Sequence, residues 1–161
     1  MAEQYTNSIP VERVREVFDY NPLTGNLHWK VRASKNTKLG SVPGCTSNGY
    51  KIVRFDKQLY RQHRVIWAWV TGESDPPFLD HRDRDRSNNR FWNLRPASIA
   101  ENNMNRAAAG VTCRSSDGRW IAQIGAGWKH FYLGTYGTEA EARAAYAGAA
   151  VVLHGEFACT E

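Results

Sequence analysis

A polar segment at residues 80–95 constrains the fold of this chain most strongly, because it gathers carboxylate, imidazole and amide groups between apolar anchors. Phe78 and Leu79 precede it, and Phe91 and Trp92 lie near its end. A run this polar is usually a solvated loop. Apolar side chains at both ends attach such a loop to a core, so the segment predicts a compact hairpin whose polar side chains converge on one small site.

A helix is predicted directly after this hairpin. Ser98 can cap it, and Glu101 stands at the capping-box offset. We expect this helix to run to about Arg106. The small residues 107–110 follow, and we place a domain boundary between residues 106 and 107.

Residues that could take part in catalysis or metal binding occur in four short groups. These are Asp80-His81 at the start of the polar segment, Asn88-Asn89-Arg90 in its middle, Asn93-Leu94-Arg95 at its end and Glu101-Asn102 on the following helix. In these residues the segment resembles the H-N-H nuclease motif of phage homing endonucleases. The resemblance implies an α+β fold in which residues 1–106 hold a ββα-metal nuclease module. It also implies hydrolysis of a DNA phosphodiester bond.

The resemblance further implies a role for each side chain. His81 is the expected general base, since an imidazole titrates near neutral pH without tuning. Asp80 and Asn102 are the expected ligands of one Mg²⁺ or Mn²⁺ ion, a hard cation that keeps its waters and takes phosphate oxygens as further ligands. Asn93 is expected to fix the ring of His81 through its side-chain amide, and Asn89 to hold the loop together. Taken alone, Asp80-His81 is typical of a salt-bridged surface pair; the other motif residues favour catalysis.

Basic side chains are concentrated around the expected site. The arginines there are Arg82, Arg84, Arg86, Arg90 and Arg95. Guanidinium groups neutralise phosphates and position a duplex without reading its sequence, so we expect all five to contact DNA. The family often has glycine near Arg84; here either the arginine contacts phosphate or the loop bends differently.

The residues before the motif show short helical and strand patterns. Residues 11–18 place their apolar side chains on one helical stripe. Residues 27–31 alternate as a strand. The dipeptide Asn48-Gly49 predicts a hairpin turn ahead of a strand at residues 50–55.

A helix is predicted at residues 61–71, ended by Gly72. His63 lies at its start and is expected to be structural, bonding a neighbouring backbone group. The basic loop at residues 30–38 lies either along a phosphate backbone or in solvent.

The chain from residue 110 to residue 158 has the pattern of a second unit. Residues 119–124 and 130–133 alternate as strands. Thr138 and Glu141 form a capping-box pattern at the start of an alanine-rich helix. The face of this helix expected to lie on the sheet carries Ala142, Ala145, Tyr146, Ala149, Val152 and Leu153. These patterns predict a small three-stranded antiparallel sheet packed on one helix.

Residues 118–124, 132–136 and 154–158 resemble the DNA-binding domain of plant ethylene-response (Apetala-type) factors. The resemblance implies a DNA-binding domain at residues 107–161 whose exposed sheet face enters a major groove. At the DNA-facing positions stand Arg114, Arg119, Gln123, His130 and Tyr132.

The chain differs from the plant ethylene-response factors at several of the compared positions. Thr112, Gly125 and His130 stand where plant members carry arginine. The plant members' preference for particular bases therefore cannot be assigned to this chain. Binding directed mainly to the DNA backbone is one possibility. A packing or protein-contact domain is the alternative.

The positive charge lies with the nuclease-like part. The chain has a net charge of +5 and a pI near 9.3, which favours a polyanionic partner. Residues 1–106 hold 17 Lys and Arg against 11 Asp and Glu, whereas residues 107–161 hold 4 against 5.

The three cysteines, Cys45, Cys113 and Cys159, are far apart and predict no disulfide framework and no zinc knuckle. A reducing compartment fits them. With no signal peptide and no long apolar run, we expect a protein in the cytoplasm of a bacterium or a phage-infected cell, away from membranes.

Two hypotheses about function remain open. The first is a divalent-metal-dependent DNA endonuclease of homing type acting on double-stranded DNA; a monomer would nick one strand, and a homodimer or sequential cuts would break both. The second is a non-cleaving, sequence-specific DNA-binding regulator on the same scaffold. An RNA-binding protein is less favoured, because the aromatic side chains form no stacking signature.

Overall fold

The computed structural model describes residues 8–105, 110–126 and 129–159. The chain forms two compact units, Met1–Pro96 and Ala97–Glu161. The predicted boundary between residues 106 and 107 lies outside the described residues. The division falls earlier in the chain, because helix α3 (Ile99–Met104) contacts the 3-10 turn η2 (Gly155–Phe157) of the second unit.

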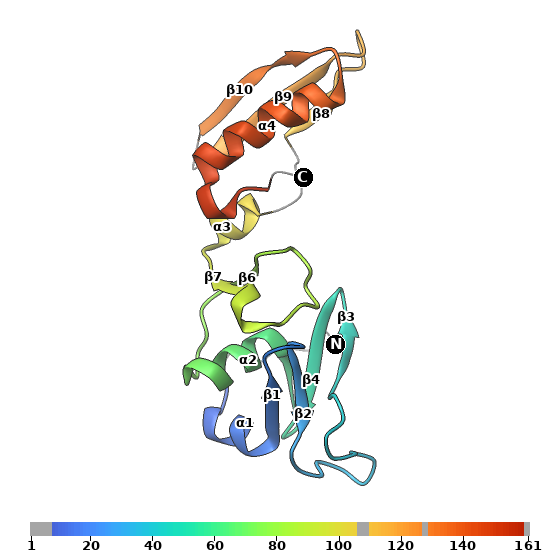
Figure 1. The fold of residues 1–161 in the computed structure, drawn as a ribbon, viewed down its shortest axis with the longest axis vertical. Coiled ribbons are helices and arrows are strands. Elements are labelled where there is room, and N and C mark those ends of the chain that lie inside the picture. The colour runs from blue at the N-terminus through green and yellow to red at the C-terminus, as the bar shows by residue number, and fades with distance from the viewer. Residues whose placement is uncertain (1–7, 106–109, 127–128, 160–161) are drawn as a thin grey trace. The chain divides into compact units, whose positions relative to one another are not determined.

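The described part of the first unit combines two helices with three small antiparallel sheets (Figure 1). Strand β1 pairs with β2, β4 lies between β3 and β5, and β6 pairs with β7. The elements in chain order are α1 (Val11–Val17), β1 (Phe18–Asn21), β2 (Asn26–Trp29), β3 (Cys45–Ser47), β4 (Tyr50–Phe55), β5 (Gln58–Arg61), α2 (Gln62–Thr71), β6 (Leu79–His81), the 3-10 turn η1 (Phe91–Asn93) and β7 (Leu94–Pro96).

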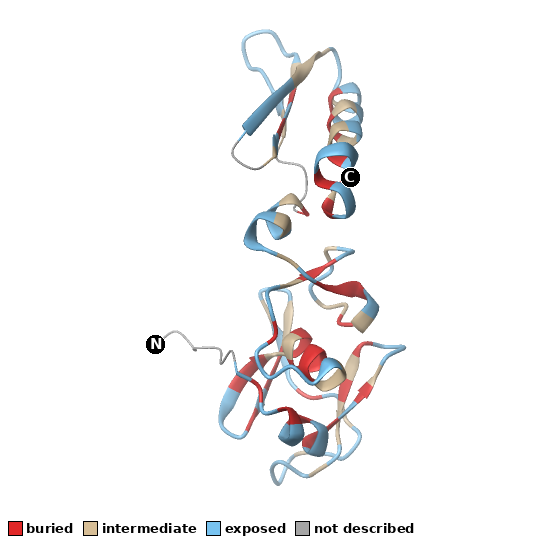
Figure 2. Ribbon diagram, turned by 90° about the vertical axis from the view of Figure 1, so that its left-hand side faces the viewer, coloured by how far each residue is buried: buried red, intermediate tan, exposed pale blue. Residues whose placement is uncertain are grey.

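The core of the first unit forms between α1, α2 and the sheets beside them. Val14, Phe18, Leu27, Val65 and Ile66 are fully buried there, and buried positions follow α2 in Figure 2. Burial of these apolar side chains is the main favourable term in folding. The predicted helical stripe at residues 11–18 is confirmed apart from its last residue, which begins β1.

Helix α2 ends as its sequence predicts. Gly72 adopts a left-handed conformation with φ of +81°, and its N–H donates to the carbonyl oxygen of Ala68. Glycine is the residue that reaches this conformation without a steric penalty from Cβ.

The second unit holds a three-stranded antiparallel sheet with one long helix on one face (Figure 1). The strand order is β10-β9-β8. Its strands and main helix are β8 (Val111–Cys113), β9 (Trp120–Ala126), β10 (Lys129–Tyr136) and α4 (Glu139–His154). This is the predicted sheet on one helix.

Local capping signals in the second unit are confirmed. Ser98 and Glu101 form a complete capping box at α3, and Thr138 and Glu141 form another at α4. The first of these helices ends at Met104, two residues before the predicted end near Arg106.

The apolar face of α4 is narrower than its composition predicts. Ala142, Tyr146 and Ala150 are buried against a sheet side that includes Ile124. Val152, which we expected on this face, is 82% exposed. The buried residues repeat every four positions, so they form one stripe, and Val152 falls outside it.

The fold is thus mixed α and β with small antiparallel sheets, and the described residues contain four α-helices. None of these helices has the length and hydropathy needed to cross a membrane.

Candidate active site

The β6–β7 hairpin positions the predicted catalytic pair. His81 stands opposite Leu94, and Asp80 stands opposite Arg95. Neighbouring residues of a strand point to opposite faces, so the imidazole and the carboxylate leave the hairpin on different sides. The backbone N–H of Arg82 donates to the carbonyl oxygen of Asn93 at 2.9 Å and extends the ladder into the loop.

Asp80 forms a buried ion pair. Nε and Nη2 of Arg95 donate to Oδ2 of Asp80 at 2.9 and 2.8 Å, and the two residues are 5% and 3% exposed. A buried charge needs such a partner, because desolvation of a single ion is very unfavourable. Arg95, which we expected to contact DNA, is therefore an internal residue of the hairpin.

His81 is buried and held by an amide. It is 4% exposed, and its Nε2 lies 3.1 Å from Oδ1 of Asn89. Because an amide oxygen only accepts, Nε2 carries the proton in this arrangement and Nδ1 carries the lone pair. Burial lowers the pKa of His81 below its ordinary value of 6.5, against the opposing effects of the Asn89 bond and nearby carboxylates such as Asp83. The imidazole is therefore neutral at neutral pH, as a base has to be.

Asn89 and Asn93 each have the contacts that we predicted for the other. The side-chain nitrogen of Asn93 donates to Oδ1 of Asp83 at 2.8 Å and to the carbonyl oxygen of Asn88 at 2.9 Å, and its Oδ1 accepts from the N–H of Asp83 at 3.1 Å. The expected contact from the Asn93 amide to the ring of His81 was wrong, and Asn89 makes that contact. The reason is the register: Asn93 lies beyond the last residue pair of the hairpin, where its amide reaches the loop.

The loop after His81 is folded by its own polar groups. Oδ1 of Asp83 accepts from the N–H of Asp85, and Oδ1 of Asp85 accepts from the N–H and hydroxyl of Ser87. Arg84 has a φ of +65°, in the left-handed region that glycine favours. The chain therefore makes the bend at this position without the glycine that the nuclease family often has.

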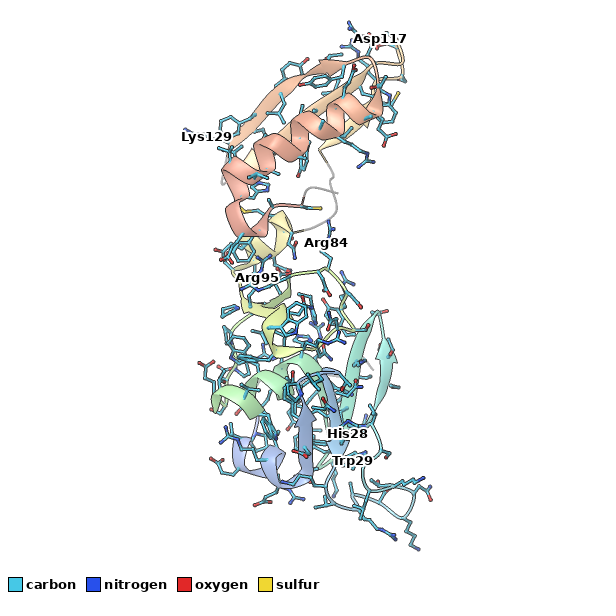
Figure 3. All side chains as sticks on the ribbon, viewed as in Figure 1. His28, Trp29, Arg84, Arg95, Asp117 and Lys129 are labelled. Carbon is cyan, nitrogen blue, oxygen red and sulfur yellow. The ribbon has the colours of Figure 1, made fainter. Side chains whose placement is uncertain are left out.

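The remaining arginines of this region divide into two groups. Arg82 and Arg86 are exposed and Arg84 is half-buried, whereas Arg90 bonds inside the protein. Nε of Arg90 donates to the carbonyl oxygen of Leu23 at 2.8 Å, and Nη1 donates to Oδ1 of Asn88 at 3.0 Å. Arg90 therefore ties the loop to the β1–β2 turn. In Figure 3, Arg84 lies on the loop and Arg95 at the hairpin.

A second histidine lies beside His81. The ring of His63, on α2, is 5.1 Å from the ring of His81 in an edge-on arrangement, and His63 is 4% exposed. Nδ1 of His63 has no hydrogen-bond partner in the described residues, so our expectation of a bond to backbone was wrong for this atom. Burial lowers the pKa of His63 well below 6.5, and the nearby His81 adds to the effect.

Tyr50 joins this cluster, and our sequence analysis missed it. Its ring centroid is 5.5 Å from that of His63 and 6.1 Å from that of His81. The guanidinium carbons of Arg61 and Arg86 lie 4.7 and 5.0 Å from the Tyr50 ring centroid. The Asn48-Gly49 turn predicted the hairpin that carries Tyr50, but no local signal predicts what the tip of that hairpin touches.

The donor set for a metal ion suits a hard cation, but its carboxylate is already occupied. Asp80 offers a carboxylate and Asn102 an amide oxygen, both ligands that Mg²⁺ accepts. Asp80 is paired with Arg95, so a cation would have to share or displace that guanidinium. Asn102 lies on α3 of the second unit and is exposed. Within the described residues, no three His, Cys, Asp or Glu side chains gather as a metal site.

In the second unit, three of the five residues expected to face DNA share one sheet face. Gln123 of β9 pairs with Tyr132 of β10, and Gly125 pairs with His130. Paired residues point to the same side, so Gln123, His130 and Tyr132 lie together, away from the buried Ile124. All three are exposed.

The other two expected DNA contacts lie at the β8–β9 turn. The guanidinium of Arg114 forms an exposed ion pair with Asp117 and lowers the pKa of that carboxyl to about 2. Arg119 is exposed. Figure 3 shows Asp117 and Lys129 at opposite ends of this sheet.

Comparison with known proteins finds two partial similarities. Residues 60–104 match the model of a family described as HNH endonuclease. This segment includes Asp80, His81, Asn93 and Asn102, and the predicted resemblance to H-N-H nucleases is confirmed.

Two relatives match a stretch of 53 residues. The AP2-like ethylene-responsive transcription factor ANT of Arabidopsis thaliana is 51% identical there, and the ethylene-responsive transcription factor WRI1 of the same plant is 49% identical. Each match covers 32% of this chain but only 10% and 12% of the two relatives. The resemblance to ethylene-response factors is confirmed over that stretch. No solved structure matches the chain.

Proposed function

We propose that this chain is a DNA endonuclease of homing type whose first unit cleaves and whose second unit holds the duplex. The observation that carries the proposal is the neutral, buried imidazole of His81, fixed by Asn89 in the hairpin of a segment that matches the HNH endonuclease family. A base held in one orientation before substrate arrives needs no reorganisation during the reaction.

His81 would take the proton of a water at Nδ1 as the oxygen of that water bonds to phosphorus, and the bond from phosphorus to the 3′ oxygen breaks, so that the 3′ oxygen leaves. General-base catalysis of this kind contributes about 10²–10⁴-fold. Arg82, Arg84 and Arg86 would bind backbone phosphates and keep the scissile bond near the ring. Asn93 and the loop carboxylates would keep the backbone around His81 in place.

A bound Mg²⁺ or Mn²⁺ would neutralise charge on the attacked phosphate and on the leaving oxygen. Asp80 and Asn102 are its proposed ligands, in keeping with the ββα-metal module that the resemblance implies. A single site of this kind cuts one strand, so a monomer is expected to nick and a homodimer to break both strands.

The second unit would contact DNA through the face that carries Gln123, His130 and Tyr132. A two- or three-stranded sheet can enter a major groove, and both plant relatives are named as transcription factors. As a homing-type enzyme the chain would act in the cytoplasm of a bacterium or a phage-infected cell.

The test is nicking of supercoiled plasmid with Mg²⁺ or Mn²⁺, with and without EDTA. His81→Ala is expected to lower the rate by about 100-fold or more, and EDTA to abolish it. His28→Ala is the matched control: this half-buried histidine of β2 bonds the carbonyl oxygen of Gly40, outside the cluster around His81. Equal nicking by His81→Ala and wild type would refute the assignment.

One observation favours a second candidate, a DNA-binding regulator that does not cleave. The carboxylate proposed for the metal is held by Arg95 in a buried pair. On this candidate, the chain binds duplex DNA tightly but leaves plasmid intact with every divalent cation.

A further inference from the structure

The ring of Tyr50 holds two guanidinium groups next to His81. Arg61 and Arg86 lie 4.7 and 5.0 Å from its centroid, within the range in which a cation is attracted to the face of an aromatic ring. Tyr50 is half-buried, and Arg86 is exposed. The same ring is 6.1 Å from that of His81.

Three separate parts of the fold build this arrangement. Tyr50 begins β4, and Arg61 ends β5 opposite Ile52, so the two side chains are diagonal neighbours on one sheet face. Arg86 comes from the loop after β6, and its Nη1 donates to the carbonyl oxygen of Asn48 at 3.4 Å. Asn48 and Gly49 have φ of +50° and +81°, the conformation of a tight hairpin turn, which brings the hairpin tip to the loop.

A guanidinium that lies against an aromatic ring still presents N–H donors at its edge. In the described residues the contacts of Arg86 are this ring and one carbonyl oxygen, with no carboxylate among them. Guanidinium groups match the geometry of phosphate oxygens and bind them through paired N–H donors. The arrangement is therefore suited to a phosphate.

We propose that Tyr50, Arg61 and Arg86 form a clamp for one DNA backbone phosphate, close to the phosphate attacked near His81. In this Tyr50 clamp the arginines bind the phosphate, and Tyr50 is a positioning residue that holds both of them. The inference rests on the proposed function for its substrate. It adds Arg61 and Tyr50, and it makes Arg86 part of a built site rather than one of several surface charges.

The first experiment measures binding of the full chain to a short duplex in EDTA over a series of salt concentrations. Arg61→Gln and Arg86→Gln are each expected to reduce the slope of log affinity against log salt by about 1, and to weaken binding roughly three- to ten-fold near physiological salt. Arg13→Gln is the control, because Arg13 is also exposed on the first unit but is ion-paired with Asp56 and Glu16. Slopes equal to wild type in both clamp variants would overturn the proposal.

Variants of Tyr50 separate positioning from charge. Tyr50→Phe keeps the ring face and is expected to bind like wild type, whereas Tyr50→Leu is expected to weaken binding without any change of charge. In Tyr50→Leu, the further change Arg61→Gln should have less effect than it has in wild type, because the arginine is no longer held. Full additivity of the two changes would remove Tyr50 from the clamp.

Plasmid nicking then distinguishes failure of the clamp from failure of the proposed function. If the chain nicks, the arginine variants are expected to raise KM with little change in kcat, since they remove binding common to substrate and transition state. Wild-type KM in both variants would overturn the clamp and leave the nuclease standing. If the chain does not nick at all, the proposed function fails and the salt series still decides the clamp.

Discussion

At the scale of single residues, the buried ion pair of Asp80 and Arg95 gives a clear prediction about stability. Arg95→Met removes the guanidinium that pairs with the buried carboxylate of Asp80 and is expected to lower the free energy of unfolding by about 3–5 kcal/mol. The double variant Asp80→Leu/Arg95→Met should recover most of that loss, because two apolar side chains replace both charges. Urea unfolding followed by tryptophan fluorescence measures both.

The exposed pair between Arg13 and Asp56 is the matched control for that measurement. Arg13→Met should change the free energy of unfolding by no more than about 1 kcal/mol, since exposed ion pairs contribute little. A loss for Arg95→Met as small as the loss for Arg13→Met would show that the Asp80–Arg95 pair is solvated and open to exchange with a cation.

The second histidine predicts a pH dependence. His63 has a folded-state pKa well below 6.5, so below pH 6.5 the unfolded chain takes up a proton that the folded chain does not. The contribution of neutral, buried His63 to the free energy of unfolding is therefore fully present above about pH 6.5. It is lost as the pH falls below that value, by at most about 1.4 kcal/mol per pH unit for one group. His81 shifts in the same direction and adds to the loss.

The variant His63→Phe tests this dependence. It removes one titrating group and the unpartnered Nδ1, so its stability at pH 7.5 should stay within about 1 kcal/mol of wild type. Its free energy of unfolding should fall less steeply than that of wild type between pH 6.5 and pH 5. Equal pH dependence of the two free energies of unfolding would mean that His63 takes up its proton in the folded chain as readily as in the unfolded chain.

The roles of individual residues were only partly predictable from the sequence. The motif predicted the hairpin that carries Asp80 and His81, and their catalytic and metal-binding roles remain predictions. The exchange between Asn89 and Asn93 was not predictable, because both are amides near the same loop and only the hairpin register decides which one reaches the ring. Tyr50 was missed because its contacts with Arg61 and Arg86 depend on how separate segments pack.

At the scale of elements, one turn positions the active-site loop. Gly25, between β1 and β2, has a φ of +72°, and a Cβ there would lie 2.6 Å from the backbone nitrogen of Arg90 and 2.8 Å from the carbonyl carbon of Asn89. The turn therefore packs directly on the backbone of the residue that holds His81. Gly40 has a φ of +74° but open space around it.

These two glycines allow strain and contact to be measured separately. Gly40→Ala should cost about 1 kcal/mol of stability from left-handed strain alone. Gly25→Ala should cost clearly more, because the backbone of Asn89 has to move, and it should also slow nicking. Equal losses of stability and unchanged nicking in both variants would mean that the loop does not depend on the β1–β2 turn.

Elements set by local chemistry were predicted well. Both capping boxes and the glycine that ends α2 depend on residues within one turn of each other, so the sequence alone determines them. The burial of α4 was predicted less well. Its composition is apolar over most of its surface, and which stripe faces the sheet is decided by packing, so that Val152 remains exposed.

At the scale of the whole molecule, the proposed function assigns chemistry to the first unit and recognition to the second. The excess of positive charge lies in residues 1–106, where phosphate contacts would supply affinity without sequence information. The second unit is nearly neutral but offers an exposed face with amide, imidazole and phenol groups. On the proposed function, the first unit would determine how fast DNA is cut and the second would determine where.

This division predicts that substitutions in the second unit change the positions of the nicks and leave the nicking rate near that of wild type. The full-chain variant Gln123→Ala/Tyr132→Ala should nick plasmid at a rate near that of wild type, because His81 is untouched, but its cut positions should become dispersed. The control Val151→Ala/Val152→Ala alters two exposed residues of α4, on the helix that covers the other side of the sheet, and should keep the wild-type positions. Mapping the nicks by primer extension compares them. Unchanged positions in the Gln123/Tyr132 variant would move recognition away from this face, to residues of the first unit other than the phosphate contacts near His81, because phosphate contacts cannot select a sequence by themselves.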